Sequence, residues 1–412
     1  MTDLMNIRVG NLAYGGEAIG RLPDGRAVFI PFAIPGELVQ VRLVEEKPHY
    51  ARAELNLVLE PSPRRIEPRC SHFTTCGGCH YQQMDYSTQL EGKTTILREQ
   101  LERIGGLKEL PDIEVIASPG ACWNYRNNVQ FHLTAQGKPG YQKMHSNQTF
   151  AIRECHLPEA SINRVWPQIE LEPMPGMERM NLRTGVNDEM MLILESSNPQ
   201  PLEFNIEQEA LSVIYKGPSD SLVLAGSDHI IMEVMDRQFR VSVNSFFQVN
   251  TLQAEAMVKH ILMNLPINDG MTFLDVYCGV GLFSAFIAEK VKLVVGIESS
   301  PEACTDFTSN LDEYDHVSLY EDKAENVLEM VNFNPDVILM DPPREGLGIR
   351  AVDGILVQGA SHLVYVSCDP ATLARDAKRL VNGGYSMMKL ALVDMFPQTF
   401  HLESISYWEK KK

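Results

Sequence analysis

The chain has 412 residues, of which 44% are hydrophobic, and its formal net charge is −18 at pH 7. This length predicts two or three domains rather than a single core. No stretch approaches the roughly 18 uninterrupted apolar residues of a membrane helix, and residues 1–10 lack the basic and apolar regions of a secretory signal. We therefore expect a globular, soluble, monomeric protein of the cytoplasm, with no membrane partner. In that compartment, the 8 cysteines are expected to be metal ligands, nucleophiles or core residues rather than a disulfide framework.

The acidic charge argues against a simple nucleic-acid binder, but local patches matter more than the total. Residues 115–153 contain no Asp or Glu, and their Arg and Lys side chains are interleaved with aromatic residues. Such a stretch fits phosphates and unstacked bases. On composition alone, a strand-rich domain whose acidic residues lie elsewhere explains it equally well.

Residues 5–60 alternate short β-type runs with glycine turns at 15–16, 24–25 and 35–36. The expected strands, 27–30 and 38–43 among them, are spaced as in a small barrel. The pattern resembles the TRAM domain, a five-stranded OB-like module that binds RNA. We assign residues 1–60 to such a barrel.

Three thiols, Cys70, Cys76 and Cys79, follow a proline-rich linker at 61–68. Three cysteines within ten residues, with two glycines between them, form a metal-site pattern. Cys155 is the best candidate for a fourth ligand. Zinc and an iron–sulfur cluster both fit four thiolates, and the three-plus-one spacing favours the cluster. The alternative is a set of structural thiols that bind no metal. Residues 61–243 are expected to form a central α+β domain.

Residues 87–106 predict an amphipathic helix, with Ser87 as its N-cap and two glycines at its end. From residue 244, strands alternate with helices, which is typical of a doubly wound parallel sheet. We assign residues 244–412 to this domain. The expected helices are 252–265, 282–289 and one that begins near 372; the expected strands are 272–277, 292–297, 336–340 and 363–366.

A glycine turn, residues 275–281 (DVYCGVG), follows the strand at 272–277 and precedes a helix. Glycines there allow a ligand to approach the backbone closely, and Glu298 ends the next strand, where it can bind ribose hydroxyls. The spacing fits S-adenosylmethionine better than a dinucleotide. The alternative is an α/β domain with a purely structural turn. Asp341 ends a further strand on the same edge.

Cys368 lies just past the buried strand 363–366. Ligands bind at this edge of open α/β sheets, so the thiol lies where a cofactor and a substrate are expected to meet.

Several motifs together resemble the RNA 5-methyluridine methyltransferases over nearly the whole chain: VNSFFQVN (243–250), FLDVYCGVGLFS (273–284), LMDPPREGLG (339–348), YVSCDPATLARD (365–376) and DMFPQTFHLESI (394–405). The subgroup with a TRAM domain and a four-cysteine cluster, typified by 23S rRNA enzymes, looks closest. The resemblance implies a multidomain α/β protein with a Rossmann-like methyltransferase domain, an N-terminal barrel and a central iron–sulfur domain. It also implies that the 87–106 helix packs on the methyltransferase domain.

The resemblance implies roles for individual residues. Cys368 would be the nucleophile that adds to carbon 6 of uridine, and Glu403 the base that removes the proton from carbon 5. The S-adenosylmethionine contacts would be Gln248, Tyr277, Glu298 and Asp341. The 4Fe-4S ligands would be Cys70, Cys76, Cys79 and Cys155. The first cysteine spacing is five residues, which departs from the radical S-adenosylmethionine signature.

The expected activity is methylation of uridine carbon 5 in RNA, most simply 23S rRNA. A tRNA uridine-C5 methyltransferase and a non-catalytic RNA- or ribosome-binding protein are the alternatives. A DNA cytosine-C5 methyltransferase is a poorer fit, because its nucleophile follows an earlier strand in a Pro-Cys pair.

Overall fold

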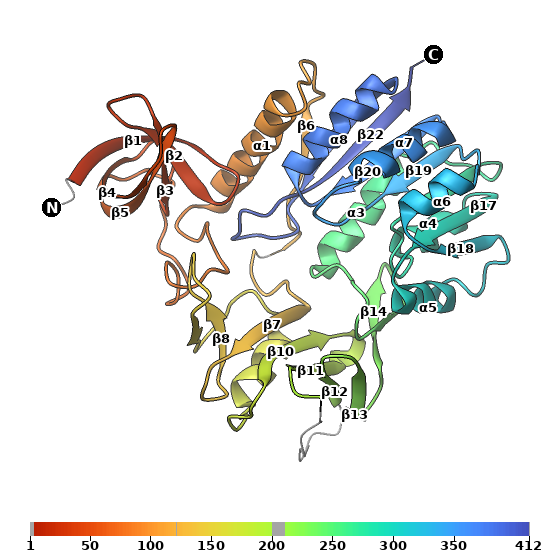
Figure 1. Cartoon of the computed structure of the whole chain (residues 1–412), viewed down its shortest axis with the longest axis horizontal. Coiled ribbons are helices and arrows are strands. Elements are labelled where there is room, and N and C mark those ends of the chain that lie inside the picture. The colour runs from red at the N-terminus through yellow and green to blue at the C-terminus, as the bar shows by residue number, and fades with distance from the viewer. Residues whose placement is uncertain (1–3, 121, 200–210, 412) are drawn as a thin grey trace.

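The computed structural model describes residues 4–120, 122–199 and 211–411. Figure 1 shows three regions: an N-terminal barrel, a central β-sheet region and a C-terminal α/β region. The N-terminal barrel is closed and has the strand order β1-β2-β3-β5-β4. Its strands are β1 (Leu4–Leu12), β2 (Glu17–Arg21), β3 (Ala27–Pro31), β4 (Leu38–Glu46) and β5 (Tyr50–Glu60). Alternate residues of these strands are buried, as a half-buried strand requires. The predicted five-stranded barrel is confirmed.

The helix expected at 87–106 is α1 (Tyr86–Arg103). Its N-cap is Asp85, whose carboxylate accepts a hydrogen bond from the Thr88 amide, so the prediction of Ser87 as N-cap was wrong. Ser and Asp are both good N-cap residues. Asp85 is the cap because it directly precedes the first helical residue and its carboxylate reaches the free Thr88 amide. In Figure 1, α1 lies between the barrel and helix α8 (Pro370–Asn382).

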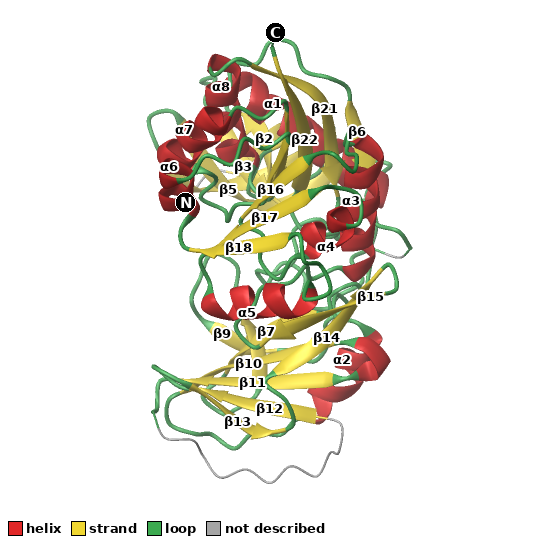
Figure 2. Ribbon diagram, turned by 90° about the vertical axis from the view of Figure 1, so that its right-hand side faces the viewer, coloured by secondary structure: helices red, strands yellow, loops and turns green. Residues whose placement is uncertain are grey.

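The central region contains a seven-stranded sheet within the described ranges, in the order β13-β12-β11-β10-β7-β8-β9. Its strands are β7 (Asn128–Leu133), β8 (Pro139–Gln142), β9 (Thr149–Ala151), β10 (Met177–Thr184), β11 (Met190–Ser196), β12 (Leu211–Lys216) and β13 (Ser221–Ala225). Three short helices, α2 (Ala160–Val165), η1 (Trp166–Gln168) and η2 (Val186–Asp188), accompany it. The hairpin of β14 (His229–Val234) and β15 (Arg237–Ser242) follows and leads toward the C-terminal sheet (Figure 2).

The C-terminal sheet has eight described strands, in the order β18-β17-β16-β19-β20-β22-β21-β6. They are β16 (Thr272–Val276), β17 (Leu293–Glu298), β18 (Val317–Glu321), β19 (Val337–Met340), β20 (His362–Ser367), β21 (Tyr385–Val393), β22 (Glu403–Lys410) and β6 (Ile113–Ile116). The helices are α3 (Thr251–Asn264), α4 (Leu282–Ala288), α5 (Pro301–Asn310), α6 (Ala324–Met330), α7 (Gly348–Gln358) and α8. The seven elements predicted for this region therefore occur within a few residues of the expected bounds.

The sheet is mixed rather than wholly parallel. Strands β18 to β20 are parallel, whereas β22 runs antiparallel between β20 and β21. β6, which precedes the central sheet in sequence, joins the far edge beside β21. The antiparallel return has a functional consequence, because the first residue of β22 lies at the edge where the parallel strands end.

One hydrophobic cluster runs from the barrel to the C-terminal sheet. It includes Val28 of β3, Leu97 of α1 and Leu373 of α8, all fully buried. Burying each such side chain contributes about 1.5–3 kcal/mol, so the barrel is held against the α/β region by a shared core. Among the residues described, no helix is long and apolar enough to cross a membrane.

Candidate active site

Four strand ends and one strand start bring the predicted site residues to one edge of the C-terminal sheet. In the order β17, β16, β19, β20 and β22, they carry Glu298, Tyr277, Asp341, Cys368 and Glu403. Parallel strands present their carboxyl ends at the same edge, and the antiparallel β22 begins there. Residues spread over 127 positions of sequence, from 277 to 403, therefore line one edge.

Cys368 and Glu403 are neighbours across two strands. Ser367 of β20 pairs with Ser404 of β22, so the residues just beyond this pair are the cysteine and the glutamate. Ser404 also donates a hydrogen bond to the Ser367 carbonyl at 3.3 Å, which ties the two strands at this point. The thiol is half-buried and the carboxylate is buried, with 4% of the residue exposed.

Two carboxylates of the site, the buried Glu403 and the half-buried Asp341, lack the hydrogen-bond partners that such charges normally have. Neither Asp341 nor Glu403 has a side-chain hydrogen bond or ion pair in the part of the chain that the structure describes. Burial, and then the charge of Asp341, raise the pKa of Glu403 well above its usual value. Burial, and then the charge of Asp275, raise the pKa of Asp341. Unpartnered acids of this kind mark a site that awaits a ligand.

The thiol itself is held in its neutral form by its surroundings. Burial raises the pKa of Cys368 to about 12, and the charges of Glu403 and Asp341 act in the same direction. Arg344 opposes this shift for both Cys368 and Glu403. The sequence reasoning missed Arg344, although the motif LMDPPREGLG contains it two residues after the Asp-Pro pair. It is exposed, and within the described ranges it has no acidic partner.

The glycine turn adopts a conformation that needs its glycines. Gly279 and Gly281 have φ values of 54° and 90°, and a Cβ on Gly281 would lie 2.4 Å from Leu311. Tyr277 also has a positive φ, 66°, which is strained for an aromatic residue. Nothing lies within 4 Å of a Cβ added to Gly279, so the turn leaves open space above its backbone. Such a turn accommodates a ligand against the start of α4.

Glu298 faces this turn. One of its carboxylate oxygens accepts a hydrogen bond from the Gly279 amide at 3.0 Å, and the other accepts from the Ser299 and Ser300 amides. The acid is therefore fixed beside the turn. Asp275, at the base of the turn, is fully buried, and its Oδ1 atom has no hydrogen-bond partner among the residues that the structure describes.

Gln248 lies in the loop between β15 and α3 and is buried. Its carbonyl accepts a hydrogen bond from Asn127 Nδ2 at 2.9 Å, which links this loop to the central region. Its side-chain amide makes no hydrogen bond within the described ranges.

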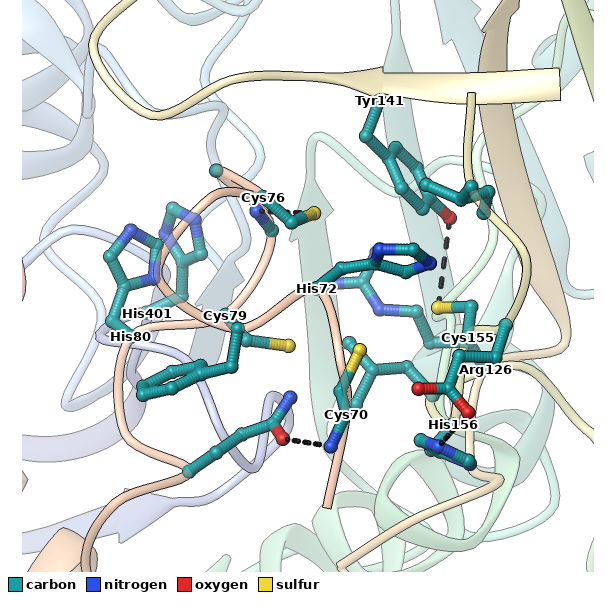
Figure 3. A pocket seen from close by; sticks show the side chains of 17 residues that line it. Cys70, His72, Cys76, Cys79, His80, Arg126, Tyr141, Cys155, His156 and His401 are labelled. Carbon is teal, nitrogen blue, oxygen red and sulfur yellow. Dashed lines mark hydrogen bonds and ion pairs between the residues drawn. The ribbon is translucent and has the colours of Figure 1, made fainter. Parts of the chain in front are cut away.

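The four predicted metal ligands line a single cavity of about 190 Å³. Cys70, Cys76 and Cys79 come from the segment before α1, and Cys155 from the loop before α2 (Figure 3). Two of the sulfur atoms accept hydrogen bonds. The Gly78 amide donates to the Cys76 sulfur at 3.4 Å, and the Tyr141 hydroxyl donates to the Cys155 sulfur at 3.9 Å.

No group of three or more His, Cys, Asp or Glu in the described ranges is arranged to hold a single metal ion. A zinc ion holds its thiolates at about 2.3 Å and needs little space between them. The cavity of about 190 Å³ is larger than a single zinc ion needs. Arg126 lines the same cavity, and within the described ranges it has no acidic partner. His72 does not serve as a ligand through Nε2, because that atom accepts a hydrogen bond from the Arg153 amide.

The structure has a methyltransferase fold that is preceded by an N-terminal TRAM-like barrel. Residues 4–55 match the TRAM domain, and residues 323–411 match the family described as tRNA (Uracil-5-)-methyltransferase. An uncharacterized RNA methyltransferase of Aquifex aeolicus is 35% identical, over 99% of both chains. One of Gloeobacter violaceus is 32% identical, over 98% of this chain and 96% of its own length. The chain belongs to the RNA uracil-5-methyltransferase family, and it is an enzyme of that class.

A solved structure supports the same fold. The tRNA (uracil-54, C5)-methyltransferase of Pyrococcus abyssi, in complex with S-adenosyl-L-homocysteine, matches with a TM-score of 0.75 and 24% identity. The match covers 98% of this chain and 100% of the archaeal one.

Proposed function

We propose that the protein methylates carbon 5 of a uridine in RNA through a covalent adduct of Cys368. The observation that carries the proposal is the group of Cys368, Glu403 and Asp341 at one sheet edge. The two carboxylates are unpartnered, and the thiol is next to one of them in register. A nucleophile beside a base is the arrangement that covalent catalysis needs.

S-adenosylmethionine supplies the electrophilic methyl group and a positive sulfonium charge. The residues around the glycine turn fit this cofactor, because the turn leaves open space beside a fixed acid. We propose that Tyr277, Glu298, Asp341 and Gln248 hold it. Among the described residues, the carboxylate of Asp341 and the side-chain amide of Gln248 have no hydrogen-bond partner, so both have hydrogen-bonding capacity for a ligand.

Carbon 5 of uracil is a poor nucleophile until carbon 6 carries a substituent. The Cys368 thiolate adds to carbon 6, and the electron pair of the 5,6 double bond moves toward carbon 5 and the carbonyl at position 4. Carbon 5 would then bond to the methyl group as the bond from that methyl group to the sulfonium sulfur breaks, and the sulfur would leave as a neutral thioether. Because burial and two acids raise the pKa of Cys368 to about 12, the free thiol is mostly protonated at neutral pH. The cations at the site, Arg344 among them, are required to favour the thiolate.

Glu403 completes the cycle. After methyl transfer, its carboxylate removes the proton from carbon 5, the double bond re-forms and the Cys368 thiolate leaves carbon 6. A carboxylate with a raised pKa is a stronger base than an exposed one, and burial raises the pKa of Glu403. The target uridine must leave its base stack to reach the thiol, at a cost of about a few kcal/mol.

Cys70, Cys76, Cys79 and Cys155 are proposed to hold a 4Fe-4S cluster. Their shared cavity and the nearby charge of Arg126 support a bulky, anionic group. Such a cluster supplies a four-point cross-link between the segment before α1 and the loop before α2. It takes no part in the methyl transfer, and its role is structural or toward the RNA.

The substrate is proposed to be 23S rRNA, with tRNA as the alternative. The barrel at 1–60, the central region at 61–243 and the catalytic region at 244–412 would hold the unfolded RNA between them. We further propose that the protein acts as a monomer in the cytoplasm.

The test measures methyl transfer to unmodified 23S rRNA and tRNA transcripts by the wild type and by Cys368→Ala. We expect the variant to lose methylation while calorimetry shows unchanged cofactor binding. Full activity in Cys368→Ala would refute the mechanism. Cofactor binding by the wild type without transfer to any RNA would favour the non-catalytic alternative. Mass-spectrometric mapping of 5-methyluridine in RNA from a deletion strain identifies the target.

A further inference from the structure

The turn between β1 and β2 of the barrel reaches the loop that carries Cys368. Tyr14 in this turn donates a hydrogen bond from its hydroxyl to Asp369 Oδ2 at 2.7 Å, between positions 355 residues apart. Asp369 directly follows Cys368 in the chain, so the contact ends one residue from the thiol. Burial and the hydrogen bond to Asp369 raise the pKa of Tyr14, and the phenol therefore remains a donor at physiological pH.

Asp369 uses its two carboxylate oxygens for different purposes. Its Oδ1 atom accepts hydrogen bonds from the Ala371 and Thr372 amides, both at 2.9 Å, and so caps α8. Its Oδ2 atom is the one that accepts from Tyr14. Tyr14 therefore completes the hydrogen bonding of the carboxylate that fixes the start of α8 immediately after the nucleophile.

The ring of Tyr14 contacts a second loop of the site. It packs edge-on against Phe400, with ring centroids 5.7 Å apart. Phe400 packs in turn against His401, with centroids 4.2 Å apart, and Glu403 follows two residues later. One barrel side chain thus touches both the loop of the nucleophile and the loop of the base.

Close packing sets the position of this turn. Gly16 has a φ of +94°, and a Cβ added to it would lie 2.9 Å from the His80 ring. Gly92 of α1 packs more closely still on Leu12, since its added Cβ would lie 2.5 Å from that side chain. The barrel is therefore seated tightly enough for Tyr14 to hold a fixed place.

We propose that Tyr14 is a positioning residue for the methyl-transfer site, through which the barrel orients the Cys368 loop. The inference rests on the proposed role of Cys368 as nucleophile. The barrel would then contribute to the rate of the reaction as well as to RNA binding. A change in the position of this loop is also expected to alter how readily the Cys368 thiol reacts.

Tyr14→Phe removes the hydroxyl but keeps the ring that packs on Phe400. A hydrogen bond to a charged group is stronger than a neutral one, and its loss is expected to lower kcat about tenfold. KM for RNA and Kd for S-adenosylmethionine are expected to stay within about twofold of the wild type, because the hydroxyl is already engaged by Asp369. Alkylation of Cys368 by iodoacetamide is expected to slow about threefold at each pH between 7 and 10.

Tyr385→Phe is the matched control. Its hydroxyl donates to the Ala360 carbonyl at the same distance, 2.7 Å, and Tyr385 begins β21 at the opposite end of the sheet from Glu403. We expect it to lower stability without changing kcat or the alkylation rate.

The experiment compares wild type, Tyr14→Phe, Tyr385→Phe and Cys368→Ala, each as the full chain, on the transcript that the wild type methylates. Iodoacetamide labelling is quantified at the Cys368 peptide by mass spectrometry. Unchanged kcat and labelling in Tyr14→Phe would overturn the inference, as would a loss confined to RNA affinity. Activity in Cys368→Ala would instead refute the proposed function, so the two failures are distinguishable.

Discussion

Lys93 of α1 forms a buried ion pair with Asp394, and its removal should destabilise the protein strongly. Both side chains are completely buried, and Lys93 Nζ lies 2.6 Å from Asp394 Oδ1. The ammonium also donates to the Phe396 carbonyl at 3.0 Å. These contacts tie α1 to the start of the loop that leads from β21 to Glu403. Lys93→Met removes the charge and keeps most of the side-chain length.

The expected loss of stability follows from the Asp394 carboxylate, which remains buried without its cation. In Lys93→Met, Asp394 Oδ1 loses its ammonium partner while the carboxylate stays buried. Breaking one side of a buried pair costs about 3–5 kcal/mol. We therefore expect the free energy of unfolding to fall by about 4 kcal/mol.

Urea unfolding at pH 7, followed by the fluorescence of the three tryptophans, measures this loss.

Two further variants make the test specific. Lys259→Met removes an exposed pair with Glu255 on α3, also at 2.6 Å, and should cost at most about 0.5 kcal/mol. Lys93→Met combined with Asp394→Leu removes both charges and should recover most of the loss. A loss below about 1 kcal/mol in Lys93→Met, or no recovery in the double variant, would refute the reasoning.

Three other results follow from the site. Glu403→Gln should accumulate a covalent RNA adduct, seen as a shifted band on a denaturing gel, and rapid clean turnover would contradict its role as base. In the free enzyme, alkylation of Cys368 should rise about tenfold per unit from pH 7 to 10 without a plateau, because its pKa is raised to about 12; a plateau near pH 9 would show an ordinary thiol. Cys79→Ala should lower the iron content of protein purified without oxygen, and unchanged iron would exclude this ligand.

The local pattern of residues was sufficient for the elements of the fold and for most site candidates. The barrel could be predicted from the sequence because glycine turns and alternating apolar residues are local signals. The strands that end at Tyr277, Asp341 and Cys368 were readable because buried apolar runs bounded by turns are local too. Family motifs then supplied Glu403 and Gln248 as candidates.

Other features depend on contacts between distant residues, and only the tertiary structure decided them. Lys93 is at a helix position that sequence treats as ordinary and polar, yet it is buried because Asp394, 301 residues later, lies opposite. Asp85 rather than Ser87 caps α1 because of how the preceding turn approaches the helix.

The active site shows the same division. The sequence by itself determined that a thiol and an acid lie at strand ends, since strand composition and turn residues act over a few positions. The antiparallel return of β22 placed Glu403 beside Cys368, and the docking of the barrel placed Tyr14 against Asp369. Strand pairing and the hydrophobic core shared by the barrel and the α/β region determine these contacts. Both depend on many interactions between residues that are far apart in the sequence, so no short stretch of sequence predicts them.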